Sequence, residues 1–117
     1  MGLVLAEEQR LQDAAKTLGH AAELLPARGR VHYNYGLTLQ HLGRRPEAEA
    51  ALLKAYQLDP KEASVLQALS IFYVQGEQWD DAAAYAEQLV RVYPNAPEPR
   101  QLLQHILQQQ SRNQQSR

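Results

Sequence analysis

Three prolines recur at a constant interval along the chain. Pro26, Pro60 and Pro94 lie 34 residues apart, and aligning the chain on them brings small and apolar residues into common columns. These columns are Ala14/Ala48/Ala82, Leu18/Leu52/Ala86 and Ala21/Ala55/Leu89. A fixed period of this length is the signature of a repeat architecture, in which similar units stack side by side. The spacing therefore predicts a short array of like units.

The segment before each proline has the pattern of an amphipathic helix. In residues 46–58, small and apolar residues follow the i, i+4, i+7, i+8 spacing of one helix face. This face consists of Ala48, Leu52, Ala55 and Tyr56. Gly43 and Gly76 each separate two such patterns, so we expect a left-handed residue to end the first helix of a unit at these points. Ala, Leu, Gln and Glu dominate the chain, and β-branched residues are few, as is typical of helices.

An all-α chain of six or seven helices is therefore expected. The predicted helices cover residues 3–8, 11–25, 30–42, 46–58, 63–75, 79–92 and 97–110. The break near Gln9 and Arg10 contains neither glycine nor proline. A single helix over 3–25 is the alternative at this point.

The period and its columns resemble the tetratricopeptide repeat, a 34-residue helix–turn–helix unit. Residues 29–62 carry the pattern most fully, and residues 63–96 follow it with Ser70 in place of a glycine and Gly76 one position early. The matching residues are Gly36, Leu39, Gly43, Ala48, Leu52, Ala55 and Pro60, then Leu69, Tyr73, Ala82, Leu89 and Pro94.

The resemblance implies an organisation for the whole chain. Residues 1–28 would be a truncated unit, 29–62 and 63–96 complete units, 97–110 a C-terminal capping helix and 111–117 a disordered polar tail. The units would stack into a short right-handed superhelix with one concave face. Its predicted core includes Leu39, Leu52, Ala55, Leu69, Tyr73 and Leu89.

Composition excludes several classes of function. Cysteine is absent, which removes disulfides and thiolate chemistry, and 12 basic against 13 acidic residues provide no overall field for nucleic acid. The arginines at 28, 30, 44 and 45 do not form one basic patch, because Arg30 and Arg44 would stand about 20 Å apart at opposite helix ends. Apolar runs are too short for a membrane span, and no signal peptide is recognisable. If the chain is complete, a cytoplasmic location is favoured.

No catalytic, metal or cofactor site is expected. The four histidines, His20, His32, His41 and His105, lack the spacing of metal ligands. Asp80 and Asp81 diverge by about 100° on a helix and suit its positive N-terminal end better than acid–base catalysis. Trp79 is expected to pack against a neighbouring helix. We therefore predict a protein that is not an enzyme.

In the family that the chain resembles, the first helix of each unit lines the concave groove, which commonly binds a peptide or a partner's helix. On this chain the groove residues would be Arg30, Tyr33, Asn34, Leu37, Gln40 and His41, then Gln67, Ile71, Val74 and Gln75. Some family members hold the C-terminal carboxylate of a chaperone. Ser64, Ala68 and Leu3 replace the basic residues of that clamp, and only Asn34 matches it, so the pattern argues against such a receptor.

Two further hypotheses remain open. The chain could be a module from a larger protein, positioning a catalytic or electron-transfer domain as such repeats do in bacterial multihaem cytochromes, and the truncated first unit favours this origin. It could also form a weak homodimer through its N-terminal end, where only Leu3, Val4 and Leu5 would cover an apolar face. That face consists of Leu11, Ala14, Leu18 and Ala22.

Overall fold

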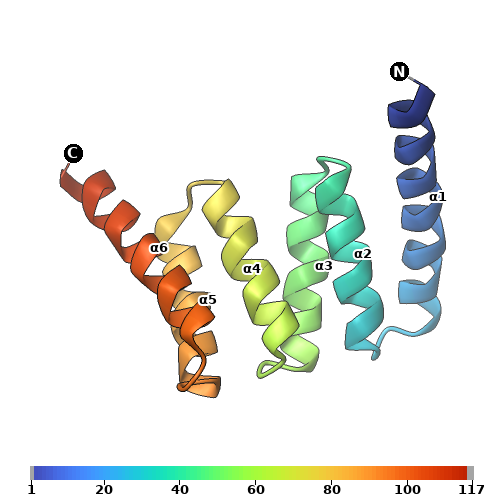
Figure 1. Ribbon diagram of the computed structural model, residues 1–117. Helices are drawn as coiled ribbons and strands as arrows, with labels where there is room; N and C mark the ends of the chain where they lie inside the picture. The colour runs from blue at the N-terminus through green and yellow to red at the C-terminus, as the bar shows by residue number, and fades with distance from the viewer. Residues whose placement is uncertain (1, 116–117) are drawn as a thin grey trace. The chain divides into compact units, whose positions relative to one another are not determined.

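A computed structural model describes residues 2–115 of the chain, with the side chains of residues 6–115. This part folds entirely into helices and turns, as predicted (Figure 1). The helices are α1 (Gly2–Leu24), α2 (Gly29–His41), α3 (Arg45–Leu58), α4 (Ala63–Gln75), α5 (Trp79–Val92) and α6 (Pro97–Gln115). They form two compact units, an N-terminal unit (Met1–Pro60) with α1–α3 and a C-terminal unit (Lys61–Arg117) with α4–α6.

The first helix is continuous. The division into 3–8 and 11–25 is wrong, and the alternative of one helix is confirmed, because nothing between Gly2 and Leu24 interrupts the backbone hydrogen bonds. The face predicted to be open is half-buried in this unit, and its members are Leu11, Ala14, Leu18 and Ala22. The side chains of Leu3, Val4 and Leu5, on which the predicted dimer depends, lie outside the described residues.

The last helix is longer than predicted. It continues past residue 110 to Gln115, so residues 111–115 are helical and the predicted disordered tail is wrong for them, while residues 116–117 lie outside the described part. The sequence beyond 110 contains no glycine or proline to end the helix. The side-chain amide of Gln110 also donates a hydrogen bond of 2.6 Å to Asp80 at the start of α5.

The turns inside the two helix pairs differ from expectation at one position. Gly43 has a φ of 77° and ends α2 in the left-handed conformation, as predicted. Gly76 has a φ of −88°, and the left-handed residue is Glu77, with a φ of 57°. The prediction for Gly76 is wrong because the left-handed position recurs after 34 residues, and that interval places it at Glu77.

The core of the N-terminal unit lies where α2 meets α3. Leu39, Leu52 and Ala55 are fully buried, as predicted. Gly36 allows the two helices to approach closely, because a Cβ atom there would lie 2.8 Å from Leu52 Cγ. On the other side of α2, a Cβ atom on Gly19 would lie 3.2 Å from the hydroxyl of Tyr35, so α1 also packs closely on α2.

In the C-terminal unit, α5 packs against both α4 and α6, and α4 contributes more buried residues than either of the other two helices. The predicted core residues Leu69, Tyr73 and Leu89 are all buried, and Ile106 of α6 is fully buried in the same unit. The ring of Tyr73 meets the ring of Phe72 edge-on, with 5.3 Å between the ring centroids, and stacks on the ring of Tyr85, with 5.7 Å between the centroids. Trp79 also has a packing role, because its ring meets His105 of α6 edge-on at 6.3 Å.

Candidate functional site

The predicted groove residues of α2 lie on its solvent-accessible side. Arg30, Asn34 and His41 are exposed, and Tyr33, Leu37 and Gln40 are half-buried. None of these six residues contributes to the cavities described below.

The predicted groove residues of α4 divide into two pairs. Gln67 and Ile71 are exposed and line a cavity in the C-terminal unit. Val74 is half-buried and Gln75 is exposed, one turn further along, and neither lines that cavity. The predicted face of α4 therefore includes part of a concave surface.

This cavity has a volume of about 400 Å³ and is enclosed by α4, the end of α5 and the start of α6. We call it the α4–α6 cavity. Its lining residues are Ala63, Gln67, Ile71, Leu89, Tyr93, Ala96, Glu98, Pro99 and Leu102.

Local structure explains how these side chains meet. Ala63, Gln67 and Ile71 are four residues apart, so they share one face of α4. Tyr93 follows the last residue of α5 and leaves the helical conformation, with a φ of −128°, because Pro94 comes next. Its backbone N–H still donates to the Leu89 carbonyl, which holds Tyr93 against the end of α5.

The cavity combines exposed apolar walls with polar groups that have no partner. Ile71 is 37% exposed and Tyr93 43%, so both present apolar surface at the cavity. Within residues 6–115, the Gln67 amide and the Glu98 carboxylate have no hydrogen-bond or ion-pair partner. Both groups can therefore bind a ligand without breaking an existing contact.

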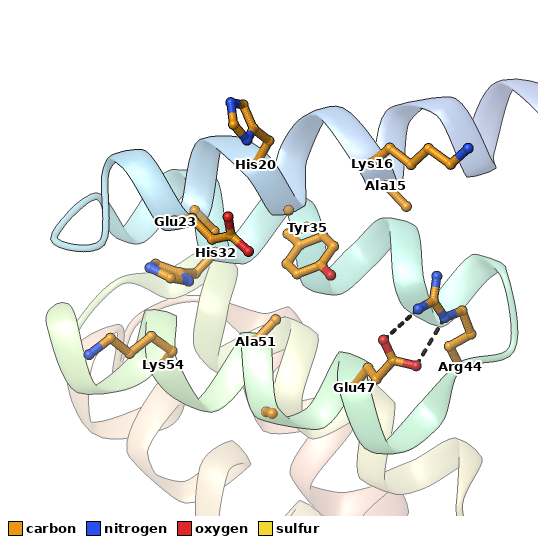
Figure 2. A pocket seen from close by; sticks show the side chains of 13 residues that line it. Ala15, Lys16, His20, Glu23, His32, Tyr35, Arg44, Glu47, Ala51 and Lys54 are labelled. Atoms are coloured by element: carbon orange, nitrogen blue, oxygen red, sulfur yellow. Dashed lines mark hydrogen bonds and ion pairs between the residues drawn. The ribbon is translucent and has the colours of Figure 1, made fainter.

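A second cavity, of about 770 Å³, lies in the N-terminal unit between α1 and α3 with α2 as its floor (Figure 2). Figure 2 shows Tyr35 at its centre, with Ala15 and Ala51 on the facing walls. Tyr35 is half-buried, because its ring reaches from α2 towards Gly19 and forms the cavity floor.

Several polar groups of this second cavity already have partners. Arg44 donates two hydrogen bonds to Glu47, from Nε at 3.0 Å and from Nη2 at 2.6 Å. These bonds raise the pKa of the Arg44 guanidinium above its usual value. His32 Nε2 lies within hydrogen-bond distance, 2.9 Å, of the Pro26 carbonyl oxygen.

The remaining candidate residues have structural contacts. Asp80 and Asp81 lie in the first turn of α5, where they accept hydrogen bonds from Gln110 and Gln78, at 2.6 Å and 3.5 Å. In the described part of the chain, His, Asp and Glu side chains form no group of three that could hold a metal ion. Within the same residues, no helix is both long enough and apolar enough to cross a membrane.

Sequence reasoning missed the residues of α5 and α6 that complete the α4–α6 cavity. Tyr93 lies in the turn before Pro94, outside the repeated helix faces from which the groove residues were predicted. The signal for Leu102 was the apolar face that a capping helix turns towards its neighbour. The signal for Glu98 was its place in the first turn of that helix.

Comparisons with known proteins agree with this architecture. The tetratricopeptide repeat family model matches residues 29–62. A comparison with curated proteins finds none that matches the chain. Among 56 matching chains of solved structure is the tetratricopeptide-repeat domain of Arabidopsis OM64. It has a TM-score of 0.73 and 16% sequence identity, over 90% of this chain and 87% of that one.

These findings confirm the resemblance seen in the sequence. The family match falls on the helix pair with the most complete set of repeat residues, and the solved structure shares the fold. Residues 29–62 are a tetratricopeptide repeat, and the chain that contains them has the all-α fold of a tetratricopeptide-repeat domain.

Proposed function

We propose that the chain is a protein-interaction module that binds a peptide segment or helix of a partner, with one apolar side chain of the partner seated in the α4–α6 cavity. Proteins of this family are in general non-catalytic interaction scaffolds, which supports the broader part of the proposal. The observation that supports the cavity as the anchor site is that Gln67 and Ile71, two predicted groove residues, line it together with Tyr93.

Physical chemistry favours this cavity as the anchor site. Its volume of about 400 Å³ is within the range of pockets that bind small ligands or single large side chains. Ile71 and Tyr93 lose exposed apolar surface when a partner covers them, and aromatic residues are enriched among the side chains that dominate interface energies. The free amide of Gln67 can donate to and accept from a peptide backbone.

The face of α2 supplies a second contact in this proposal. Tyr33 and Leu37 are half-buried and one helical turn apart, and the neighbouring Arg30, Asn34 and His41 are exposed. This face is a separate candidate surface on the N-terminal unit, and a partner would contact it independently of the α4–α6 cavity.

The test is selection of random 12-residue peptides displayed on phage against the immobilised full chain. We expect wild-type protein to enrich peptides with a large apolar residue, and the double variant Ile71→Ser/Tyr93→Ser to enrich none of them. Leu107→Ser is the matched control, because Leu107 is 41% exposed on α6 but lies outside the cavity. Tyr33→Ala/Leu37→Ser tests the α2 face in the same way.

Circular dichroism and melting temperature must be unchanged in each variant before its selection is interpreted. If the Ile71/Tyr93 variant enriches the same peptides as wild-type protein, the cavity is not the anchor site. If only the α2 variant loses them, binding takes place on the N-terminal unit.

A further inference from the structure

The cavity that we propose as the anchor site carries one ionised group. Within its described lining, Glu98 is the only residue whose side chain is charged at neutral pH. Glu98 lies in the first turn of α6, and its carboxylate has no partner among residues 6–115. The nearest cation along the chain, Arg100, is engaged elsewhere, because its guanidinium donates to the carbonyl of Pro94.

The segment that supplies most of the cavity lining is acidic in composition. Residues 62–98 contain six acidic side chains and only one basic one. Three of the acids, Glu77, Asp80 and Asp81, lie at the other end of α5 from the cavity, and Lys61 and Arg100 flank the segment. The basic residue within the segment is Arg91, whose Nη2 lies 3.9 Å from Glu87 Oε2, so it is already beside a carboxylate of its own helix. The Glu98 carboxylate in the cavity lining attracts a cation and repels an anion during association, and a charge at the rim of an interface acts mainly on partner choice.

We infer that the segment bound in the α4–α6 cavity carries a lysine or arginine close to its apolar anchor, and that Glu98 selects this residue. This inference rests on the proposed function and adds the chemistry of the partner. Glu98 shares the cavity with Ile71 and Tyr93, so one short stretch of partner must satisfy both features. In an extended segment, residues i and i+2 point to the same side, which places the basic residue two positions from the anchor.

The experiment extends the peptide selection with charge variants of the full chain. Wild-type protein is expected to enrich peptides in which Lys or Arg stands within two positions of a large apolar residue. The variant Glu98→Lys should keep the apolar residue and replace the basic preference by Asp or Glu. Glu87→Lys is the matched control, because it makes the same charge change outside the cavity lining and should keep the basic preference.

A charge-swap measurement then gives the size of the effect. One enriched peptide is synthesised, together with a derivative in which its basic residue is glutamate, and each is titrated into both proteins by fluorescence anisotropy. On wild-type protein the derivative should bind about three- to tenfold more weakly, and on Glu98→Lys this order should reverse. The difference should shrink as salt is raised from 50 to 300 mM, because exposed charges are screened.

The outcomes separate this inference from the proposed function. The enriched peptides could depend on Ile71 and Tyr93 and yet show no preference for a basic residue, or a preference for an acidic one. Either result, or a basic preference that Glu98→Lys leaves unchanged, would overturn the role of Glu98 and leave the cavity as an anchor site. Failure to enrich any peptide that depends on Ile71 and Tyr93 would overturn both.

Discussion

The helix pairs α2–α3 and α4–α5 are built from the same repeat, yet they pack with different residues at equivalent positions. In α2–α3, Gly36 faces Leu52 so closely that a Cβ atom would lie 2.8 Å from Leu52 Cγ. The residues 34 positions later are Ser70 and Ala86, both fully buried. Ser70 has room for its hydroxyl, which donates to the Leu66 carbonyl at 2.7 Å. The pair α2–α3 thus fills the interface with a small residue opposite a large one. The pair α4–α5 fills the same interface with two residues of intermediate size.

The largest effect is expected where the large residue is removed. Leu52→Ala should lower the free energy of unfolding by about 2–5 kcal/mol, because Leu52 is fully buried and its loss leaves a cavity next to Gly36. Chemical denaturation monitored by circular dichroism measures it. Leu58→Ala, at a position that is 37% exposed, is the control and should cost much less. A loss below about 1 kcal/mol in Leu52→Ala would contradict the packing described for α2–α3.

An exchange of residue types between the pairs sharpens the comparison. Gly36→Ser should cost about 1–3 kcal/mol, since the added Cβ meets the Leu52 side chain. In the double variant Gly36→Ser/Leu52→Ala, which copies the residues of α4–α5, the combined loss should be about 1 kcal/mol smaller than the sum of the two single losses. Recovery should be partial, because the Leu52 backbone nitrogen also lies 3.2 Å from the added Cβ. Strict additivity would show that the two positions do not compensate.

The smallest effect concerns the turn in each pair. Glu77 has a φ of 57°, a conformation that costs a residue with a Cβ about 1 kcal/mol, so Glu77→Gly should stabilise the chain by up to about 1 kcal/mol. Gly43→Ala, at a φ of 77° with no atom close to the added Cβ, should destabilise it by a similar amount. Thermal melts of both variants check the opposite signs. A destabilised Glu77→Gly would mean that the glutamate side chain makes a contact worth more than the backbone strain.

The sequence predicted the fold and the core well because both follow from periodicity. Leu39, Leu52 and Leu69 are fully buried, as expected for apolar residues at repeated helical positions. The left-handed turn at Glu77 was missed because glycine was taken as the signal, when the repeat interval located the turn. The end of α6 was missed because the polar composition after residue 110 predicts disorder, although no glycine or proline ends the helix there.

The candidate site was predicted only in part, for a related reason. Gln67 and Ile71 belong to one helix face, which periodicity identifies. Tyr93 and Glu98 reach the same cavity from a turn and from the start of another helix. Their convergence depends on how α4, α5 and α6 pack within the unit, and no periodic pattern records it.

Among the described residues of each unit, extensive packing joins only helices that follow one another in the chain: α1 with α2, α2 with α3, α4 with α5 and α5 with α6. Residues that touch are therefore close in sequence, and a chain with such a low contact order loses little entropy when its loops close. Helical proteins of this kind fold in microseconds to milliseconds, whereas ribosomes add about 5–20 residues per second. We therefore expect the exposed apolar faces of a nascent unit to be covered long before the next unit has been synthesised.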